Sequence, residues 1–196
     1  MTSNIKAQLQ ERLLFISRFI KAPGQIGSLT PSSKFLAKKM IEAVPWKDAS
    51  AIAELGAGTG AITKYIPRYA RTSTKVLLFE KDAFLRTQLE RQYPEFPCYA
   101  DGCELQLAVR SEGIEQLDCI LSGLPFFNFP RAVRSKLIEQ IRLSLKPGGL
   151  FIAFQYSQQM KSQLCEHFIM KDIQFVTMNV PPAFVYICQN KGGSFE

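Results

Sequence analysis

The chain has 196 residues, of which 46% are hydrophobic, and a formal net charge of +7. Its length is that of one ordinary domain with a proper core. No apolar run reaches the roughly 18 residues of a transmembrane helix, and the start lacks the plan of a signal peptide. The five cysteines form no C-x-x-C pair and there is one histidine, which excludes a zinc pattern. We therefore expect one cytoplasmic domain over residues 1–196, with reduced thiols and no bound metal.

The positive charge is concentrated at the start of the chain. Residues 1–39 contain seven lysines or arginines and one acid, Glu11, so they carry +6 of the total charge of +7. A positive segment joined to a nearly neutral domain indicates an anionic partner. That partner is either a membrane surface or a nucleic acid.

The first expected element is a helix over residues 4–21. Its apolar side chains recur every three or four residues and so form one face. They are Ile5, Leu9, Leu13, Ile16 and Ile20. A basic helix with a bulky apolar face is typical of a segment that lies in a membrane interface, so one interpretation of residues 1–22 is a membrane-binding helix. The alternative is a helix packed on the domain with its basic face in solvent.

A second helix is expected from about residue 31 to residue 43. Thr30 followed by Pro31 is typical of an N-cap with proline in the first helical position. Ser32 and Ser33 would then lie in the first turn, where free N–H groups can share an anionic ligand. The simpler interpretation, which we favour, is that these serines only satisfy the helix end.

From residue 51 onward, strands and helices alternate. Strands are expected over 51–55, 75–80, 117–121, 150–154, 172–179 and 183–189, with a further short strand before Asp101. Helices are expected over 61–70, 82–92, 131–145 and 157–167. Such alternation predicts an α/β fold whose mostly parallel sheet is covered on both faces. The last two strands are joined by the short Pro181-Pro182 connection, so we expect them to form an antiparallel hairpin.

The first strand of this series leads into the segment Glu54-Leu55-Gly56-Ala57-Gly58-Thr59-Gly60. Glycines at alternate positions permit positive φ and a close approach of the backbone to a ligand. Dinucleotide-binding folds instead use G-x-G-x-x-G to bring a pyrophosphate to a helix N-terminus. An acid at the strand end would repel a pyrophosphate, but it suits a ligand that carries an ammonium or a sulfonium. The alternative is a tight turn without a ligand.

Polar residues also follow the next strands. Glu80 lies 20 residues after Gly60, about the spacing at which doubly wound folds place a carboxylate against a ribose diol. Asp101-Gly102 follows the short third strand, and Ser122-Gly123-Leu124-Pro125-Phe126-Phe127 follows the fourth. Because ligands of open α/β sheets bind beyond the carboxyl ends of the strands, we expect these groups to form one site.

The pattern E-x-G-x-G-x-G resembles motif I of the class I S-adenosylmethionine (SAM) methyltransferases. The resemblance implies a doubly wound, Rossmann-like fold with a mostly parallel seven-stranded sheet and an antiparallel C-terminal hairpin. It implies SAM as cofactor and S-adenosylhomocysteine (SAH) as product. Glu80 would hold the ribose hydroxyls, Asp101 the adenine amine and Glu54 the methionine end. The implied cofactor-binding residues are Glu54, Gly56, Ala57, Gly58, Gly60, Glu80, Lys81, Asp101, Gly102 and Ser122.

The S-G-L-P-F-F turn occupies the place where amino methyltransferases carry N-P-P-Y or N-L-P-Y. In those enzymes, main-chain carbonyls and a side-chain amide accept hydrogen bonds from the target amine, and an aromatic ring packs over it. The resemblance implies a catalytic turn of Gly123, Leu124, Pro125 and Phe126, in which Gly123 replaces the Asn and removes the side-chain acceptor. Phe126, Phe127 and Phe129 would form an aromatic wall for a nitrogen that becomes cationic. The alternative is that these rings pack in the core.

Several segments together are similar to the bacterial phospholipid N-methyltransferases. They are G-S-L-T-P-S-S from Gly27, the E-L-G-A-G-T-G loop, S-G-L-P-F-F-x-F-P and the late N-V-P-P-A-F-V-Y. This family implies methylation of phosphatidylethanolamine in up to three steps toward phosphatidylcholine. It also implies an N-terminal helix that binds anionic membranes. Ser28, Phe127 and Arg131 are the implied substrate-binding residues.

On this basis we expect a monomer that associates peripherally with the inner face of the cytoplasmic membrane. A more distant likeness to the rRNA adenine dimethylases appears in Lys21-Ala22-Pro23-Gly24-Gln25 and in the L-P-F turn. Those enzymes keep an Asn before L-P-Y and add a C-terminal helical domain, whereas this chain has Gly123 and stops at Glu196. A nucleic-acid substrate is therefore the alternative to a lipid.

Overall fold

A computed structural model describes residues 32–192 of the chain. The expected helix over 4–21 and the expected substrate residue Ser28 lie outside the described residues. Within residues 32–192, no helix is long and apolar enough to cross a membrane.

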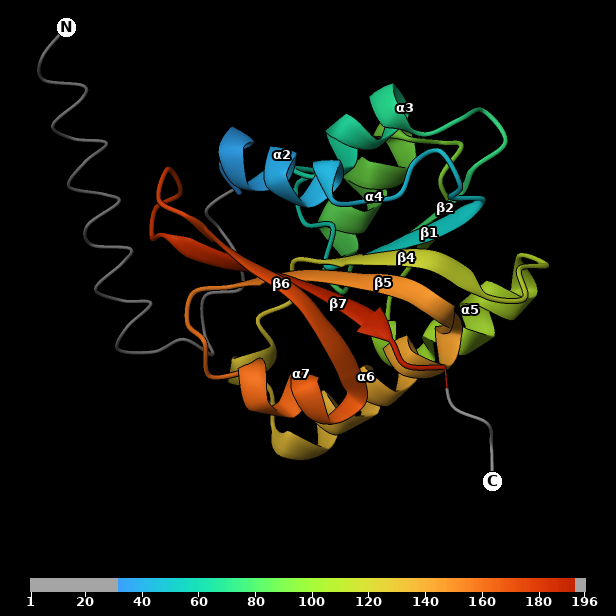
Figure 1. Ribbon diagram of the computed structural model, residues 1–196. Helices are drawn as coiled ribbons and strands as arrows, with labels where there is room; N and C mark the ends of the chain where they lie inside the picture. The colour runs from blue at the N-terminus through green and yellow to red at the C-terminus, as the bar shows by residue number, and fades with distance from the viewer. Residues whose placement is uncertain (1–31, 193–196) are drawn as a thin grey trace, which may run out of the picture. The chain divides into compact units, whose positions relative to one another are not determined.

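The centre of the described part is one seven-stranded sheet with the strand order β3-β2-β1-β4-β5-β7-β6 (Figure 1). Strands β1 to β5 run parallel to one another, and β7 runs antiparallel to both β5 and β6. The predicted doubly wound α/β fold with a C-terminal antiparallel hairpin is therefore confirmed. The strands are β1 (Ala51–Leu55), β2 (Lys75–Phe79), β3 (Cys98–Tyr99), β4 (Leu117–Ser122), β5 (Leu145–Gln155), β6 (Phe168–Val176) and β7 (Ala183–Asn190).

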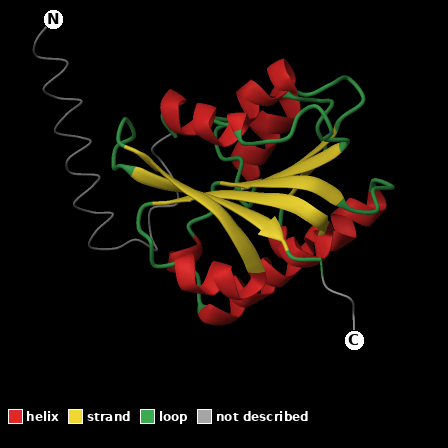
Figure 2. Cartoon of the chain, viewed as in Figure 1, coloured by secondary structure: helices red, strands yellow, loops and turns green. Residues whose placement is uncertain are grey.

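Helices cover both faces of the sheet (Figure 2). One face carries α2 (Lys34–Glu42), α3 (Ile66–Tyr69) and α4 (Ala83–Gln92), and the other carries α5 (Leu105–Ser111), α6 (Arg131–Ser144) and α7 (Lys161–His167). Three short 3-10 segments complete the described elements: η1 (Thr63–Tyr65), η2 (Gly102–Glu104) and η3 (Phe126–Asn128).

Each face of the sheet has its own hydrophobic cluster. Along β1, Ile52 packs with α2 and α4 on one side, while Ala53 and Leu55 pack with α5, α6 and α7 on the other. All five residues of β1 and all six of β4 are buried. A strand covered on both faces reads as a continuous apolar run, which explains why the sequence located these two strands well.

Some element boundaries differ from the sequence prediction. Helix α2 begins at Lys34, and Ser33 is its N-cap, since the Ser33 hydroxyl accepts from the N–H of Leu36 at 3.2 Å. The expected N-cap at Thr30 was therefore wrong, while the simpler role for Ser33 is confirmed. The expected helix over 61–70 is a 3-10 turn followed by the four-residue α3, which has Pro67 in its first turn. Proline has no N–H to continue the hydrogen bonds of the preceding turn.

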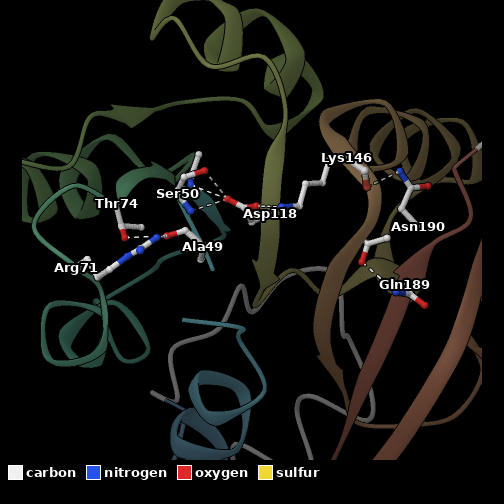
Figure 3. Close-up of polar contacts among 10 residues, drawn as sticks. Ala49, Ser50, Arg71, Thr74, Asp118, Lys146, Gln189 and Asn190 are labelled. Atoms are coloured by element: carbon white, nitrogen blue, oxygen red, sulfur yellow. Dashed lines mark hydrogen bonds and ion pairs between the residues drawn. The ribbon is translucent and has the colours of Figure 1, made fainter. Parts of the chain in front are cut away.

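The amino ends of the parallel strands are held by a polar network around Asp118 (Figure 3). Its carboxylate accepts from the N–H groups of Ser50 and Ala51 at 2.6 and 2.9 Å, from the Ser50 hydroxyl, and from Lys146 at the start of β5. Burial alone would raise the pKa of Asp118, but these hydrogen bonds hold it below its usual value. At this edge the buried acid is fully partnered and joins β1, β4 and β5.

Candidate active site at the carboxyl edge of the sheet

The glycine loop after β1 folds across the end of β2. The N–H groups of Gly56 and Ala57 donate to the carbonyl of Phe79 at 2.8 and 3.0 Å. Gly56, Gly58 and Gly60 have φ values of +73°, +56° and +76°, a region that favours glycine. The alternating glycines are thus required by the backbone path, which leaves the loop's N–H groups close to the edge of the sheet.

Glu80 fixes this loop from the end of β2. Its carboxylate accepts from the N–H of Gly58 at 2.7 Å and from the N–H of Asp82 at 2.9 Å. Each carboxylate oxygen has a second lone pair, so both remain able to accept a hydroxyl from a ligand. The position and orientation of Glu80 suit the predicted contact with a ribose diol.

Glu54, the acid at the end of β1, is fully buried. One carboxylate oxygen accepts from the Thr63 hydroxyl at 2.7 Å, and the other has no hydrogen-bond partner among the described residues. Burial raises the pKa of Glu54 to about 8, and the charge of Glu80 adds to this, against a lowering by the Thr63 hydrogen bonds. A buried carboxylate with an unused acceptor is costly, and a cation bound beside it would remove that cost.

A cleft of about 130 Å³ opens beside the ends of β2 and β3. Seven residues predicted from the sequence line it: Gly56, Glu80, Lys81, Asp101, Gly102, Leu124 and Phe129. Asp101 also accepts from the N–H of Cys103 at 2.8 Å and so caps η2, while it remains exposed to solvent. The structure therefore brings together residues from the ends of four strands, as the parallel topology requires.

The sequence predicted only part of the apolar wall of the cleft. Val133 and Leu137 of α6 line it together with Phe79, Cys103 and Phe129. Val133 and Leu137 are four residues apart and so lie on one face of the helix. The sequence predicted this helix but contained no signal for the face that it turns toward the site.

The turn after β4 packs directly against the glycine loop. A Cβ atom on Gly56 would lie 2.8 Å from Cδ2 of Leu124, and one on Gly123 would lie 3.0 Å from the carbonyl oxygen of Gly56. The N–H of Gly123 also donates to the carbonyl of Leu55 at 2.9 Å. The close approach explains why position 123 has no side chain, and it gives the cleft and the turn one shared wall. We call residues 122–127 the acceptor turn, because the sequence predicts that they hold the substrate amine.

Two further side chains shape this turn. The Ser122 hydroxyl is buried and accepts from the N–H of Leu124 at 3.2 Å, so in this structure it serves the turn, and its contact with a cofactor stays a prediction. Gln155, at the end of β5, donates from Nε2 to the carbonyl of Leu124 at 2.8 Å and to that of Phe154 at 2.6 Å. Gln155 was not predicted, because the site was expected at the ends of the first four strands and Gln155 ends the fifth.

The three phenylalanines of the turn have different surroundings. Phe126 is 1% exposed and packs edge-on against Phe151 at 5.8 Å between ring centroids. The prediction that the ring of Phe126 packs over a substrate amine is therefore wrong, because this ring is buried in the core. Phe129 lines the cleft, and Phe127 is half exposed. Arg131, at the first position of α6, is exposed, and its contact with a substrate stays a prediction.

No group of three or more His, Cys, Asp or Glu side chains within residues 32–192 could hold a metal ion. The described polar groups instead suit an organic ligand with hydroxyls at one end and positive charge at the other. Glu80 and Asp101 supply acceptors beside an apolar wall, and Glu54 supplies an unused buried acceptor at the loop.

Comparisons with known proteins agree with this geometry. No family model matches the sequence. The chain is 30% identical over 193 residues to an ornithine lipid N-methyltransferase from Singulisphaera acidiphila, a match that covers 95% of this chain and all of the relative. The chain belongs to the family of this lipid N-methyltransferase.

Solved structures show the same fold for the methyltransferase. The N-methyltransferase NodS from Bradyrhizobium japonicum, in complex with SAH, superposes with a TM-score of 0.67 over 80% of this chain and 86% of NodS, at 11% identity. An rRNA methylase from Streptococcus thermophilus gives a TM-score of 0.57 over 80% of this chain and 94% of that protein, at 16% identity. At these identities the likeness concerns the fold alone. Together with the family, it makes this protein a SAM-dependent methyltransferase.

Proposed function

We propose that the protein methylates the amine of a membrane lipid at the carboxyl edge of its sheet. The contact between Gly56 and Leu124 carries this proposal, because it makes one wall common to the cofactor cleft and the acceptor turn. The substrate is a proposal by analogy with the Singulisphaera acidiphila relative, whose name assigns it ornithine lipid. Phosphatidylethanolamine, expected from the sequence, is the second candidate substrate.

Different residues of the site would hold different parts of the cofactor. Glu80 would accept hydrogen bonds from the ribose, and Asp101 from the adenine, which would lie against Val133 and Leu137. Glu54 would face the positively charged end of the cofactor. When bound, SAM supplies a methyl group on a sulfonium, which an unprotonated amine can accept.

The acceptor turn would align the amine with that methyl group. Transfer from a sulfonium depends mainly on in-line alignment, so positioning can supply much of the rate. Gln155 and the N–H of Phe126 hold the carbonyl of Leu124 and so fix the path of the turn. Gly123 cannot contribute a side chain, so the main-chain carbonyl of Gly123 would be an acceptor for the amine. Phe127 and Phe129 remain as the aromatic rings available to a nitrogen that becomes cationic.

His167 is not suited to remove the amine's proton. It is the last residue of α7, directly before Phe168, which pairs with Asn190 at the amino edge of the sheet. His167 therefore lies at the opposite edge from the turn, as expected for a structural residue. We propose that the amine loses its proton to water before transfer, so the rate should rise with pH up to the pKa of the lipid amine.

The reaction would take place at a membrane surface. The basic segment 1–22 would bind the anionic inner face of the cytoplasmic membrane, with the enzyme acting as a monomer. The likeness to an rRNA methylase concerns the fold alone and does not favour a nucleic-acid substrate.

Methyl transfer from labelled SAM tests the proposal directly. The full chain is incubated with vesicles of an anionic lipid that contain ornithine lipid, phosphatidylethanolamine or neither, and the lipids are then separated. We expect label in the headgroup of at least one aminolipid, and much less label with Glu80→Ala at a SAM concentration that is not saturating for the variant. Label in neither aminolipid, with label in added RNA, would replace the lipid proposal by the nucleic-acid alternative.

A further inference from the structure

The β6–β7 hairpin ends in a group of exposed apolar side chains. Phe175, Met178 and Val180 are 55%, 62% and 45% exposed, and Phe35 of α2 is 38% exposed. Phe175 and Phe35, with Met178, line a hollow of about 400 Å³ between α2 and the hairpin. We call Phe35, Phe175, Met178 and Val180 the hairpin patch. Exposed apolar residues that gather in one place, beside charged ones, commonly mark an interaction site.

Lysines border the hairpin patch. Lys38, Lys39 and one acid, Glu42, line the same hollow, and Lys34 lies 5.2 Å from the ring of Phe35. Lys38 forms an exposed pair with Glu42 at 3.6 Å, which contributes little in solvent. Among the described residues, no ion pair joins Lys39 or Lys34 to an acid. The border of the patch is therefore positive.

The hairpin and α2 are joined by a buried side chain. Asn179 is 3% exposed, its Oδ1 accepts from the N–H of Ser33 at 2.9 Å, and its Nδ2 donates to the carbonyl of Pro181 at 2.7 Å. Ser33 in turn caps α2. The hairpin tip and the start of α2 thus form one platform, with Met178 and Val180 on either side of the anchoring residue.

This platform lies at the same edge of the sheet as the site. The start of β7 pairs with the end of β5, with Phe184 opposite Gln155, and Gln155 donates to the carbonyl of Leu124 in the acceptor turn. In Figure 1 the loop between β6 and β7 and the beginning of α2 lie on one side of the described domain. A surface that docked on the hairpin patch would therefore face the edge at which the amine is held.

We propose that the hairpin patch is a second membrane contact, which docks the catalytic domain on an anionic bilayer with Met178 and Val180 among the acyl chains. Apolar side chains at a loop tip bordered by lysines fit an interface whose headgroups are negative and whose interior is hydrocarbon. The patch includes Phe35 of α2, and the lysines of this helix border it, so their positive charges would meet the same anionic surface. The choice of a membrane as occupant rests on the proposed lipid substrate.

Tryptophan fluorescence distinguishes this contact from binding through the N-terminal segment alone. Met178→Trp places a reporter in the hairpin patch, and Ile169→Trp places a matched one on β6 at the amino edge, where Ile169 is 47% exposed and pairs with Gln189. Vesicles of phosphatidylglycerol with brominated acyl chains quench only a tryptophan that enters the bilayer. The wild type, whose single tryptophan is Trp46, gives the background.

We expect the hairpin reporter of Met178→Trp to be quenched, and the fluorescence of Ile169→Trp to be quenched no more than that of the wild type. Equal quenching of the two reporters would overturn the proposal. So would an unquenched hairpin reporter in a protein that sediments with the vesicles. Self-association through the patch would also overturn it, and would appear as a larger sedimentation coefficient of the wild type than of Met178→Asp without vesicles.

A second pair of variants measures the contribution to binding. Met178→Asp should weaken binding to anionic vesicles by about tenfold, because it replaces an apolar side chain by a charge that the bilayer repels. Ile169→Asp should change binding by less than about twofold. An equal effect of the two variants would contradict a contact at the hairpin patch.

The same proteins are tested on a short-chain aminolipid in neutral micelles. The hairpin contact, together with the proposed function, predicts that Met178→Asp keeps wild-type methyl transfer there and loses most of it on vesicles. If no aminolipid is methylated while the hairpin reporter is still quenched, the result counts against the lipid substrate alone. Transfer in micelles and vesicles alike, with the hairpin reporter unquenched, would count against the hairpin contact alone.

Discussion

The two edges of the sheet each contain a buried acid, and the two acids differ in their hydrogen-bond partners and in the direction of their pKa shifts. Asp118 at the amino edge accepts from two N–H groups, a hydroxyl and Lys146, and its pKa is lowered. Glu54 at the carboxyl edge has one side-chain partner, Thr63, and an oxygen without any among the described residues, and its pKa is raised to about 8. The first arrangement stabilises the fold, whereas the second leaves a buried oxygen that a bound ligand can satisfy.

The difference separates stability from function within one fold. Partners for Asp118 come from the chain itself, so its contribution is present without any ligand. Glu54 costs free energy in the cofactor-free protein, a cost that a functional site can carry because the ligand offsets it. Substitutions at the two edges should therefore change different quantities.

The largest effect is expected for Asp118→Ala. The change leaves the buried N–H of Ala51 without its acceptor, and an unpaired buried group costs about 1–3 kcal/mol, so with the lost Ser50 and Lys146 contacts we expect the free energy of unfolding to fall by roughly 3 kcal/mol. Urea unfolding measures this loss, and calorimetry should show a SAM affinity within about twofold of the wild type. If Asp118→Ala lost as much SAM affinity as Glu80→Ala, the claim that the amino edge contributes to stability and not to cofactor binding would be wrong.

Glu80→Ala should lower SAM affinity strongly and change stability little. It removes both the acceptors for the ribose and the hydrogen bond that holds Gly58, so we expect SAM affinity to fall about 100-fold, with a change in unfolding free energy below about 1 kcal/mol. Isothermal titration calorimetry and urea unfolding give the two values. Glu80→Gln, which keeps one acceptor, serves as the control with an intermediate affinity, and an unchanged affinity in both variants would place the ribose elsewhere.

Glu54 should make cofactor binding depend on pH. The cofactor-free protein holds a proton on Glu54 below about pH 8, and a positively charged ligand favours the ionised form. SAM affinity should therefore rise with pH between about 6 and 8, by up to about tenfold per unit. Glu54→Gln, measured over the same range, should remove most of the slope, and an identical slope in this variant would assign it to another group.

The same acid should lower stability as the pH rises. Its folded pKa of about 8 lies above the usual 4.5, so the folded state binds more protons than the unfolded state between these values. The unfolding free energy of the cofactor-free protein should fall across this window, by at most about 1.4 kcal/mol per pH unit. In Glu54→Gln the unfolding free energy should decrease less with pH. Saturating SAM should also make this decrease smaller, because it favours the ionised form of Glu54.

The smallest effect is expected for Gln155→Leu. Removing the hydrogen bond to Leu124 costs about 1 kcal/mol of positioning, so we expect kcat to fall about fivefold with SAM affinity unchanged. Asn190 is the matched buried amide at the amino edge, where it donates to the carbonyl of Leu145 at 2.8 Å. Asn190→Leu should lower stability and leave kcat unaltered; if it lowers kcat as much, the role assigned to Gln155 is wrong.

The sequence predicted much of the fold because buried parallel strands and strand-end acids are local signals. Glu54, Glu80 and Asp101 could be placed at one edge because the carboxyl ends of parallel strands lie together. The role of Thr63 could not be found in this way, since it depends on a contact with Glu54 that spacing does not encode. Gln155 had one usable signal, its place at the end of a buried strand.

The phenylalanine-rich turn shows a second limit. The pattern identified an aromatic turn, but it could not tell which ring enters the core. Packing against Phe151 decides that Phe126 is buried, while Phe129 lines the cleft. The register of α6, which brings Val133 and Leu137 to the cleft, likewise follows from tertiary packing.

A crystal structure of the complex with SAH tests the central claim most directly. We predict the adenine in the cleft between Asp101 and Val133, the ribose hydroxyls on Glu80, and the amino end at the glycine loop beside Glu54. The network around Asp118 should be the same with and without SAH. SAH bound away from Glu80, or a carboxylate of Glu54 left as unpartnered as before, would contradict the account.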